Sequence, residues 1–347
     1  MNIRIGIPRA LLYYNYVTLW KTFFTLLGAE VLISGYTNKL TLDLGRDMVV
    51  DEACLPVKIF FGHTAQLLEQ KPDFLFVPRM VSVEKSAYIC PKIIGLPDIL
   101  EAGKKEMPAL IKPTMNMVST GNIDSFLREA GSCLTTDRRK ISRAWKIARQ
   151  EQNAEDRQAL DKSRSTEIGA ARTGSKLPML LLGHRYNLYD DFLNLNIRKR
   201  LWQMGCDLWT PEQFSEESKE DTIKTLPKAI FWTFGKDILG TVRCFSRLPG
   251  PKGVVIISSF GCGIDSFIGN MAMRYLHKAG IPYLNITLDE HSGEAGLETR
   301  LEAFLDMIRW RRPFNEDHIS SYGTPLGDPE GYAGIHGVYG YSATSYQ

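Results

Sequence analysis

Short apolar runs alternate with longer amphipathic stretches along most of this chain, and this alternation constrains its fold more than any other feature. In the first third, we expect strands at residues 3–7, 30–34 and 73–78 and helices at 10–27 and 57–69. Strands that are joined through helices lie parallel, because a parallel connection needs a long crossover. The pattern therefore predicts an α/β fold with a parallel sheet.

The alternation stops in the middle of the chain and then starts again. Residues 122–166 are rich in Arg, Lys, Glu, Gln and Ala, which predicts two helices, the second of them long. The expected elements that follow are strands at 179–182, 207–210, 229–233, 254–258 and 282–286, and helices at 190–203, 264–278 and 296–311.

We therefore predict two α/β halves that are separated by a helical insertion. The predicted parts are a first α/β domain at 1–121, a helical insertion and linker at 122–176, a second α/β domain at 177–312, and a Gly/Tyr-rich tail at 313–347. The tail lacks periodicity, which is typical of a segment without regular structure.

Composition excludes several classes of function. The chain has 347 residues and 42 basic against 39 acidic side chains, a net charge of +3 that argues against a nucleic-acid groove or an anionic membrane surface. No apolar run approaches the roughly 20 residues that a membrane span needs. The N-terminal residues resemble a strand rather than a signal segment, so we expect a cytoplasmic protein.

Three of the six cysteines lie in turns where helices are expected to begin. Cys54 stands two residues before Pro56, Cys90 is followed directly by a proline, and Cys262 lies between two glycines ahead of an expected helix. Ligands gather at the carboxyl ends of parallel strands, and three thiolates there would suit an iron–sulfur cluster.

The alternative interpretation treats the cysteines as ordinary core residues. Free cysteine is among the most buried residue types, and Cys133, Cys206 and Cys244 fit that description. There is no CxxC pair and no dense disulfide framework. Spacing alone leaves both interpretations open for Cys54, Cys90 and Cys262.

Nucleotide motifs are incomplete. The sequence contains no G-x-x-x-x-G-K-[ST] loop. The GCGIDS stretch follows an expected strand and precedes a helix, but Ser266 stands where a dinucleotide loop has its third glycine. A nucleotide-binding α/β enzyme with structural cysteines is therefore the weakest of the alternatives.

Two groups of polar residues are further candidates. His184, Tyr186 and Asn187 follow an expected strand and would face the same edge of the sheet or cap the turn there. The Asp289-Glu290-His291 segment with Glu294 could be an acid/base group, but we favour a capping role for the helix that follows.

Eight ordered motifs resemble those of one family. They are IGIPRAL, LWKTFFTLLGAEVLIS, EACLPVK with GHTAQLL, VPRM, YICPK, GHRYNLYD, SSFGCGIDS and LDEHSGEAGLETRLEAFLDM. In this order they resemble the 2-hydroxyacyl-CoA dehydratase family in the broad sense, which includes benzoyl-CoA reductase subunits and double-cubane-cluster proteins. The branch that is most similar is activase-related, and the resemblance runs from about residue 3 to residue 312.

The resemblance implies two Rossmann-like domains with parallel sheets and a cluster in the cleft between them. By motif, Cys54, Cys90 and Cys262 match the cysteines that hold a [4Fe-4S] cluster in this family. A double-cubane [8Fe-9S] cluster is the alternative cofactor and would need more thiolates. The implied partner is an ATP-dependent activase that carries its own iron–sulfur cluster. A homodimer and a heterodimer both remain open.

The resulting expectation is an iron–sulfur redox protein of anaerobic metabolism. It would accept low-potential electrons from the activase and use them for reduction or dehydration at the cluster, as a reductase or dehydratase component. The alternative is a non-catalytic scaffold that carries a cluster, or an electron-transfer partner. The sequence identifies neither a substrate nor a catalytic residue, and it decides neither cluster size nor CoA binding.

Overall fold

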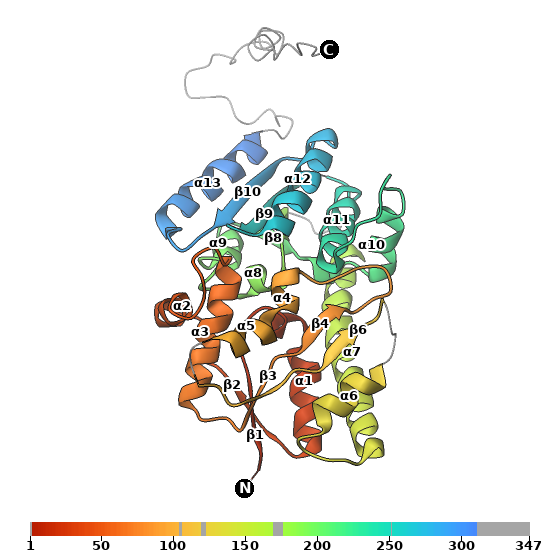
Figure 1. Cartoon of the computed structure of the whole chain (residues 1–347). Helices are drawn as coiled ribbons and strands as arrows, with labels where there is room; N and C mark the ends of the chain where they lie inside the picture. Colours follow the sequence, from red (N-terminus) through yellow and green to blue (C-terminus); the bar gives the residue numbers. More distant parts are fainter. Residues whose placement is uncertain (1, 104–105, 119–122, 169–175, 251, 311–347) are drawn as a thin grey trace, which may run out of the picture. The chain divides into compact units, whose positions relative to one another are not determined.

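The computed structural model describes residues 2–103, 106–118, 123–168, 176–250 and 252–310, with side chains described outside 161–168. The protein is an α/β fold with parallel sheets and many helices (Figure 1). The predicted tail at 313–347 lies outside the described residues.

Two four-stranded parallel sheets are formed by separate parts of the chain. The first has the strand order β2-β1-β3-β5, and the second has the order β10-β9-β7-β8. Their strands are β1 (Arg4–Ile7), β2 (Glu30–Ile33), β3 (Phe74–Phe76), β5 (Ala109–Ile111), β7 (Leu177–Leu182), β8 (Cys206–Trp209), β9 (Gly253–Ser259) and β10 (Tyr283–Leu288). A small third sheet pairs β4 (Arg79–Ser82) with β6 (Thr114–Asn116).

The helices connect these strands as the alternating pattern predicts. They are α1 (Tyr13–Leu27), α2 (Lys39–Arg46), α3 (Leu55–Glu69), α4 (Pro91–Ile94), α5 (Leu96–Ala102), α6 (Ile123–Gly131), α7 (Arg138–Ile168), α8 (Arg185–Tyr189), α9 (Ile197–Gln203), η1 (Pro211–Gln213), α10 (Glu216–Ile223), α11 (Thr233–Ser246), α12 (Gly263–Lys278) and α13 (Glu294–Trp310). The helix pair expected at 122–166 corresponds to α6 and α7, and α1 ends at Gly28 in the left-handed region, as predicted.

Both sheets are buried in one continuous apolar core. Six of the seven residues of β9 are buried, which is typical of a parallel strand covered on both faces. Ile5 of the first sheet and Leu181 and Val255 of the second are each fully buried. Both sheets belong to one compact unit, Met1–Ile308, and the predicted domain boundaries remain predictions.

Helices α2 and α3 pack with their backbones in direct contact. A Cβ atom added at Gly62 would lie 1.7 Å from the carbonyl oxygen of Thr41, and one at Gly45 would lie 1.9 Å from that of Lys58. Because no side chain fits at either position, the two glycines fix how closely α2 approaches the helix that follows Cys54.

Two predicted elements are wrong. The apolar run at 229–233 is no strand of the second sheet, because only Trp232 pairs with another segment, in an isolated bridge to Tyr88, and α11 begins at Thr233. The helix predicted at 190–203 is interrupted, because Leu195 and Asn196 adopt left-handed conformations and the helix begins only at Ile197.

No helix within the described residues combines the length and the apolar composition that a bilayer crossing requires.

Candidate functional site

Each of the three candidate cysteines is the N-cap residue of a helix. Cys54 precedes α3 with Pro56 in its first turn, Cys90 precedes α4 with Pro91 as the first residue, and Cys262 precedes α12. Unpaired backbone N–H groups at a helix start stabilise negative charge, so all three thiols occupy positions that favour a thiolate or a bound sulfide.

The structure brings these three cysteine segments together. Gly261, which adopts a φ of +76°, lies so close to Cys54 that an added Cβ would be 3.7 Å from the Cys54 Cα atom. The ammonium group of Lys92, two residues after Cys90, lies 3.3 Å from the carbonyl oxygens of both Glu52 and Gly261. Segments from both sheets therefore meet at one place.

The three thiols also interact electrostatically. Burial raises the pKa of Cys262 far above its ordinary value, and Asp265, Cys54 and Cys90 raise it further. Burial likewise raises the pKa of Cys54, while the backbone N–H of Val57 and the charge of Lys92 oppose that rise. Cys54 and Cys262 are 8% and 9% exposed, so without a positive partner both thiols stay protonated.

The other three cysteines lie in ordinary structural settings. Cys206 is buried as the first residue of β8, Cys244 lies in α11, and Cys133 follows the end of α6. Burial raises the pKa values of Cys133 and Cys244. These settings match the interpretation of all three as core or near-core residues.

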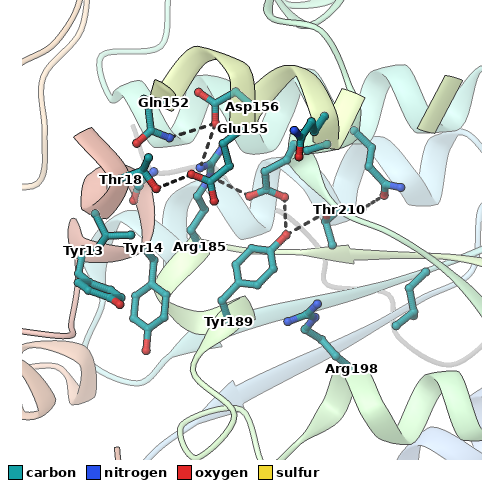
Figure 2. Close-up of a pocket in the computed structure, with 17 residues that line it drawn as sticks. Tyr13, Tyr14, Thr18, Gln152, Glu155, Asp156, Arg185, Tyr189, Arg198 and Thr210 are labelled. Atoms are coloured by element: carbon teal, nitrogen blue, oxygen red, sulfur yellow. Dashed lines mark hydrogen bonds and ion pairs between the residues drawn. The ribbon is translucent and has the colours of Figure 1, made fainter. Parts of the chain in front are cut away.

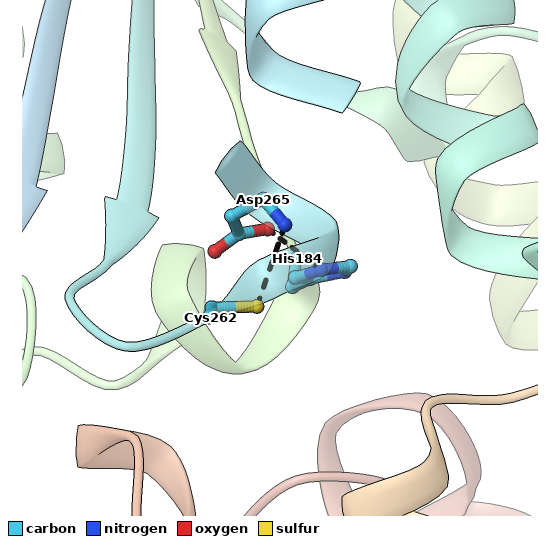
Figure 3. A group of neighbouring side chains, drawn as sticks. All are labelled: His184, Cys262 and Asp265. Carbon is cyan, nitrogen blue, oxygen red and sulfur yellow. Dashed lines mark hydrogen bonds and ion pairs between the residues drawn. The ribbon is translucent and has the colours of Figure 1, made fainter. Parts of the chain in front are cut away.

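A buried carboxylate orients the residues around Cys262 (Figure 3). Asp265 accepts hydrogen bonds from the backbone N–H of Ser259 at 3.0 Å and from the His184 Nε2 atom, which lies 2.8 Å from its Oδ1 atom. The backbone N–H of Asp265 in turn donates to the Cys262 sulfur at 3.4 Å. The carboxylate thus ties the α12 N-terminus to the end of β9 and to the start of α8.

His184, Cys262 and Asp265 place one ligand atom each within 4.8 Å of one another. A single zinc ion with ligand distances of about 2.0–2.1 Å would hold its tetrahedral ligands about 3.3 Å apart. The 2.8 Å separation of His184 and Asp265 is shorter and matches a direct hydrogen bond. This geometry favours Asp265 as an orienting group rather than as a ligand of a mononuclear metal site.

His184 and Tyr186 form the wall of the site beside the thiols. Their rings are stacked, with centroids 5.0 Å apart and an interplanar angle of 25°. Burial raises the pKa of the Tyr186 phenol well above its ordinary value, and Asp265 and the three cysteines add to the rise. These residues follow β7, as predicted, and Asn187 accepts a hydrogen bond from the Ser259 hydroxyl there, which is the predicted turn-bonding alternative.

A cavity of about 350 Å³ adjoins the segments of Cys54 and Cys262. It is lined by Arg46, Asp51, Glu52, Ala53, Leu55, Lys58, Phe260, Gly261, Asp289, Glu290 and His291. Within it, the Glu290 carboxylate pairs with the buried Lys58 ammonium and, at 2.9 Å, with the Arg46 guanidinium. This ion pair joins α3 to the loop that follows β10.

The acidic residues that follow β10 make different kinds of contact. Asp289 accepts hydrogen bonds from the His291 backbone N–H at 2.8 Å and the Ser292 hydroxyl at 3.0 Å, so it closes the turn that precedes α13, and its capping of that helix stays a prediction. The His291 N–H is also the main cause of the lowered pKa of Asp289. Glu290 instead faces the cavity, and Glu294 pairs with Arg200.

A second, larger cavity is lined in part by residues of α8 (Figure 2). It measures about 620 Å³, and α8 contributes Arg185 and Tyr189, one helical turn apart. Arg185 pairs with Glu212 at 2.8 Å, and the Tyr189 hydroxyl donates to the same carboxylate at 2.9 Å. Tyr186 of the same helix interacts electrostatically with the thiols, so α8 contributes side chains both to this cavity and to the cysteine site.

Sequence reasoning missed three residues of the site. Lys92, Asp265 and Lys58 each lie within four residues of a candidate cysteine, inside the YICPK, GCGIDS and EACLPVK stretches. Each of them also contacts a residue far away in the sequence, namely Gly261 for Lys92, His184 for Asp265 and Glu290 for Lys58. The cysteine motifs were therefore the only sequence signal that could have pointed to them.

Comparison with known proteins defines the class of this chain. Residues 4–214, more than half of the chain, match the CoA enzyme activase uncharacterised domain (DUF2229), and the chain belongs to this family. Residues 239–308 match the 2-hydroxyglutaryl-CoA dehydratase, D-component. The chain is thus related to the 2-hydroxyacyl-CoA dehydratases.

No curated protein matches the chain. Among solved structures, glutamate racemase from Campylobacter jejuni subsp. jejuni is 10% identical with a TM-score of 0.21, covering 90% of this chain and 100% of that one. A putative phosphosugar isomerase from Silicibacter pomeroyi DSS-3 is 11% identical with a TM-score of 0.22, covering 89% and 85%. Likenesses this weak carry no argument about function.

Proposed function

We propose that this protein holds an iron–sulfur cluster on Cys54, Cys90 and Cys262 and receives low-potential electrons from an ATP-dependent activase. The observation that carries the proposal is the meeting of three N-cap cysteines from distant parts of the chain, of which Cys54 and Cys262 are buried and Cys90 is partly buried. The match to activase-related and dehydratase D-component families supports the same conclusion.

The donor set fits an iron–sulfur cluster better than any other common group. Thiolate sulfur is the ligand that iron–sulfur clusters prefer, and backbone N–H groups near the sulfurs tune their potential. Here the N–H of Asp265 points to the Cys262 sulfur. The high pKa values of the two buried thiols are the expected property of ligands that ionise only when a positive centre binds.

Each part of the site then has a role. The three thiolates would hold a [4Fe-4S] cluster, which supplies one electron at a time at low potential. Asp265 fixes the Cys262 turn through its hydrogen bonds with Ser259 and His184, and the ring of His184 stacks on that of Tyr186 beside the thiols. Cys133, Cys206 and Cys244 lie in other settings, which favours the single cluster over the double-cubane [8Fe-9S] form.

The cavity beside Cys54 supports a catalytic role over simple electron storage. Its volume of about 350 Å³ accommodates a small substrate directly next to the thiol segments. A protein that only stored electrons would gain nothing from a polar chamber at this place. We therefore propose that reduction or dehydration of a small substrate takes place there.

The experiment is activase-dependent reduction of anaerobically purified protein. The activase and ATP are added, and the visible absorbance and paramagnetic resonance of the protein are followed, with a Cys262→Ser variant as the control. We expect ATP-dependent reduction of the wild type and none of the variant. A cluster that dithionite reduces but the activase does not would contradict the proposed partnership.

The catalytic part of the proposal has its own test. Small oxygen- and nitrogen-donor molecules are added to the reduced protein, and its paramagnetic resonance spectrum is recorded. A spectrum that shifts with such molecules supports substrate chemistry at the cluster. A spectrum that none of them changes would support the alternative, an electron-carrying scaffold.

A further inference from the structure

Lys92 is the side chain that connects all three cysteine segments. It lies two residues after Cys90, and its Nζ atom is 3.3 Å from the carbonyl oxygen of Glu52 and 3.3 Å from that of Gly261. Glu52 stands two residues before Cys54, and Gly261 directly precedes Cys262. The Lys92 ammonium group thus connects the Cys90 segment to the Cys54 segment and to the Cys262 segment.

These contacts join segments that are far apart in the sequence. Lys92 and Glu52 are 40 residues apart in sequence, and Lys92 and Gly261 are 169 apart. An ammonium group has three N–H donors, and two of them satisfy these carbonyl groups.

Lys92 also brings a positive charge to the cysteine segments. Its ammonium group reaches the carbonyl oxygens of the segments that carry Cys54 and Cys262. Three thiolates around a cluster form an anionic group, and Asp265 lies beside it. Net charge and hydrogen bonds are two of the factors that set the potential of an iron–sulfur cluster.

We infer that Lys92 is a positioning residue that aligns the Cys54 and Cys262 turns before a cluster is inserted and that stabilises the reduced, more negative state afterwards. The stabilisation of the reduced state rests on the proposed function, whereas the alignment of the two turns does not. Its geometric basis is the pair of carbonyl contacts.

The first test uses the cluster-free full-length chain. A short bifunctional thiol reagent is added, and the Cys54–Cys262 cross-link is quantified by mass spectrometry. We expect Lys92→Met to lower the yield about threefold or more, because the two turns lose their common anchor and the effective concentration of one thiol near the other falls. Lys92→Arg should restore part of the yield, and Lys85→Met, which changes an exposed lysine before Cys90, should leave it unchanged.

The second test uses the cluster-loaded protein. At a fixed solution potential near the midpoint, we expect the ratio of reduced to oxidised Lys92→Met protein to fall roughly tenfold relative to wild type, with Lys92→Arg close to wild type.

The outcomes separate the inference from the proposed function. Unchanged cross-linking in Lys92→Met would overturn the positioning role, and an unchanged reduced fraction would overturn the charge role. A wild-type protein that takes up no iron would contradict the proposed function, while the cross-linking result would still decide the positioning role.

Discussion

The Nε2 atom of His184 lies 2.8 Å from the Oδ1 atom of Asp265, and both side chains are almost completely buried. The other carboxylate oxygen of Asp265 accepts the backbone N–H of Ser259. Through this carboxylate, the end of β9, the start of α12 and the start of α8 share one anchor directly beside Cys262.

Removing this anchor should destabilise the protein. Asp265→Ala leaves two buried donors without an acceptor, and we expect the free energy of unfolding to fall by about 3 kcal/mol. Asp265→Asn retains an oxygen acceptor and should cost less. Chemical denaturation measures both effects. The control is Asp191→Ala at an exposed site, which should change stability by less than about 0.5 kcal/mol, and an equal loss in both alanine variants would contradict the anchoring role.

The contact of α2 with α3 gives a steric prediction. In Gly62→Ala the new methyl group would lie 1.7 Å from the Thr41 carbonyl oxygen, so α2 must move, and we expect a loss of about 3 kcal/mol. Gly269→Ala in α12 is the matched control, because nothing lies within 4 Å of its added Cβ atom. That variant should gain about 0.5–1 kcal/mol from helix propensity. Equal stabilities of the two variants in thermal unfolding would refute the close helix crossing.

His63 predicts how stability depends on pH. Burial is the main cause that lowers its pKa to about 4 from an ordinary value of 6.5. Because the folded protein binds a proton at His63 less readily than the unfolded chain does, the neutral His63 side chain contributes to the free energy of unfolding. This contribution is fully present above pH 6.5 and is lost as the pH falls toward 4. The 2.5-unit difference corresponds to about 3 kcal/mol.

The measurement compares the wild type with His63→Gln in urea denaturation from pH 7.5 to pH 4. We expect the stability of the wild type relative to the variant to fall by about 3 kcal/mol over this range. A difference that stays constant with pH would show that His63 titrates normally in the folded protein.

The buried ion pair of Lys58 and Glu290 predicts non-additive substitutions. Glu290→Gln leaves the Lys58 ammonium, which is 5% exposed, without its carboxylate, and should cost about 3 kcal/mol. Adding Lys58→Met removes the unpaired charge and should recover most of that loss. Denaturation of both single variants and the double variant gives the coupling energy, and purely additive losses would contradict a direct pair.

The parallel fold was predictable because its strands are nearly continuous apolar runs that alternate with amphipathic helices. The run at 229–233 has the same composition, yet only Trp232 pairs with another segment, which periodicity cannot reveal. The left-handed conformation of Leu195 is rare for its residue type and could not be predicted, whereas Asn196 is of a type that adopts this conformation more readily.

The features of the site that depend on neighbouring residues in the sequence were predictable. The prolines after Cys54 and Cys90 and the glycines around Cys262 indicate turns and helix starts, and the structure makes each cysteine an N-cap residue. The contacts of Lys92 and Asp265 bring together residues far apart in the chain, so only the folded structure gives them.

The most direct test of the central claim is iron and sulfide content after anaerobic purification. The wild type is compared with Ser variants of Cys54, Cys90 and Cys262, and with Cys133→Ser and Cys206→Ala as controls. The proposal predicts about four iron and four sulfide per wild-type chain, the same in both controls, and severe loss in each of the three site variants. Equal metal content in all variants, or a wild type without iron, would contradict it.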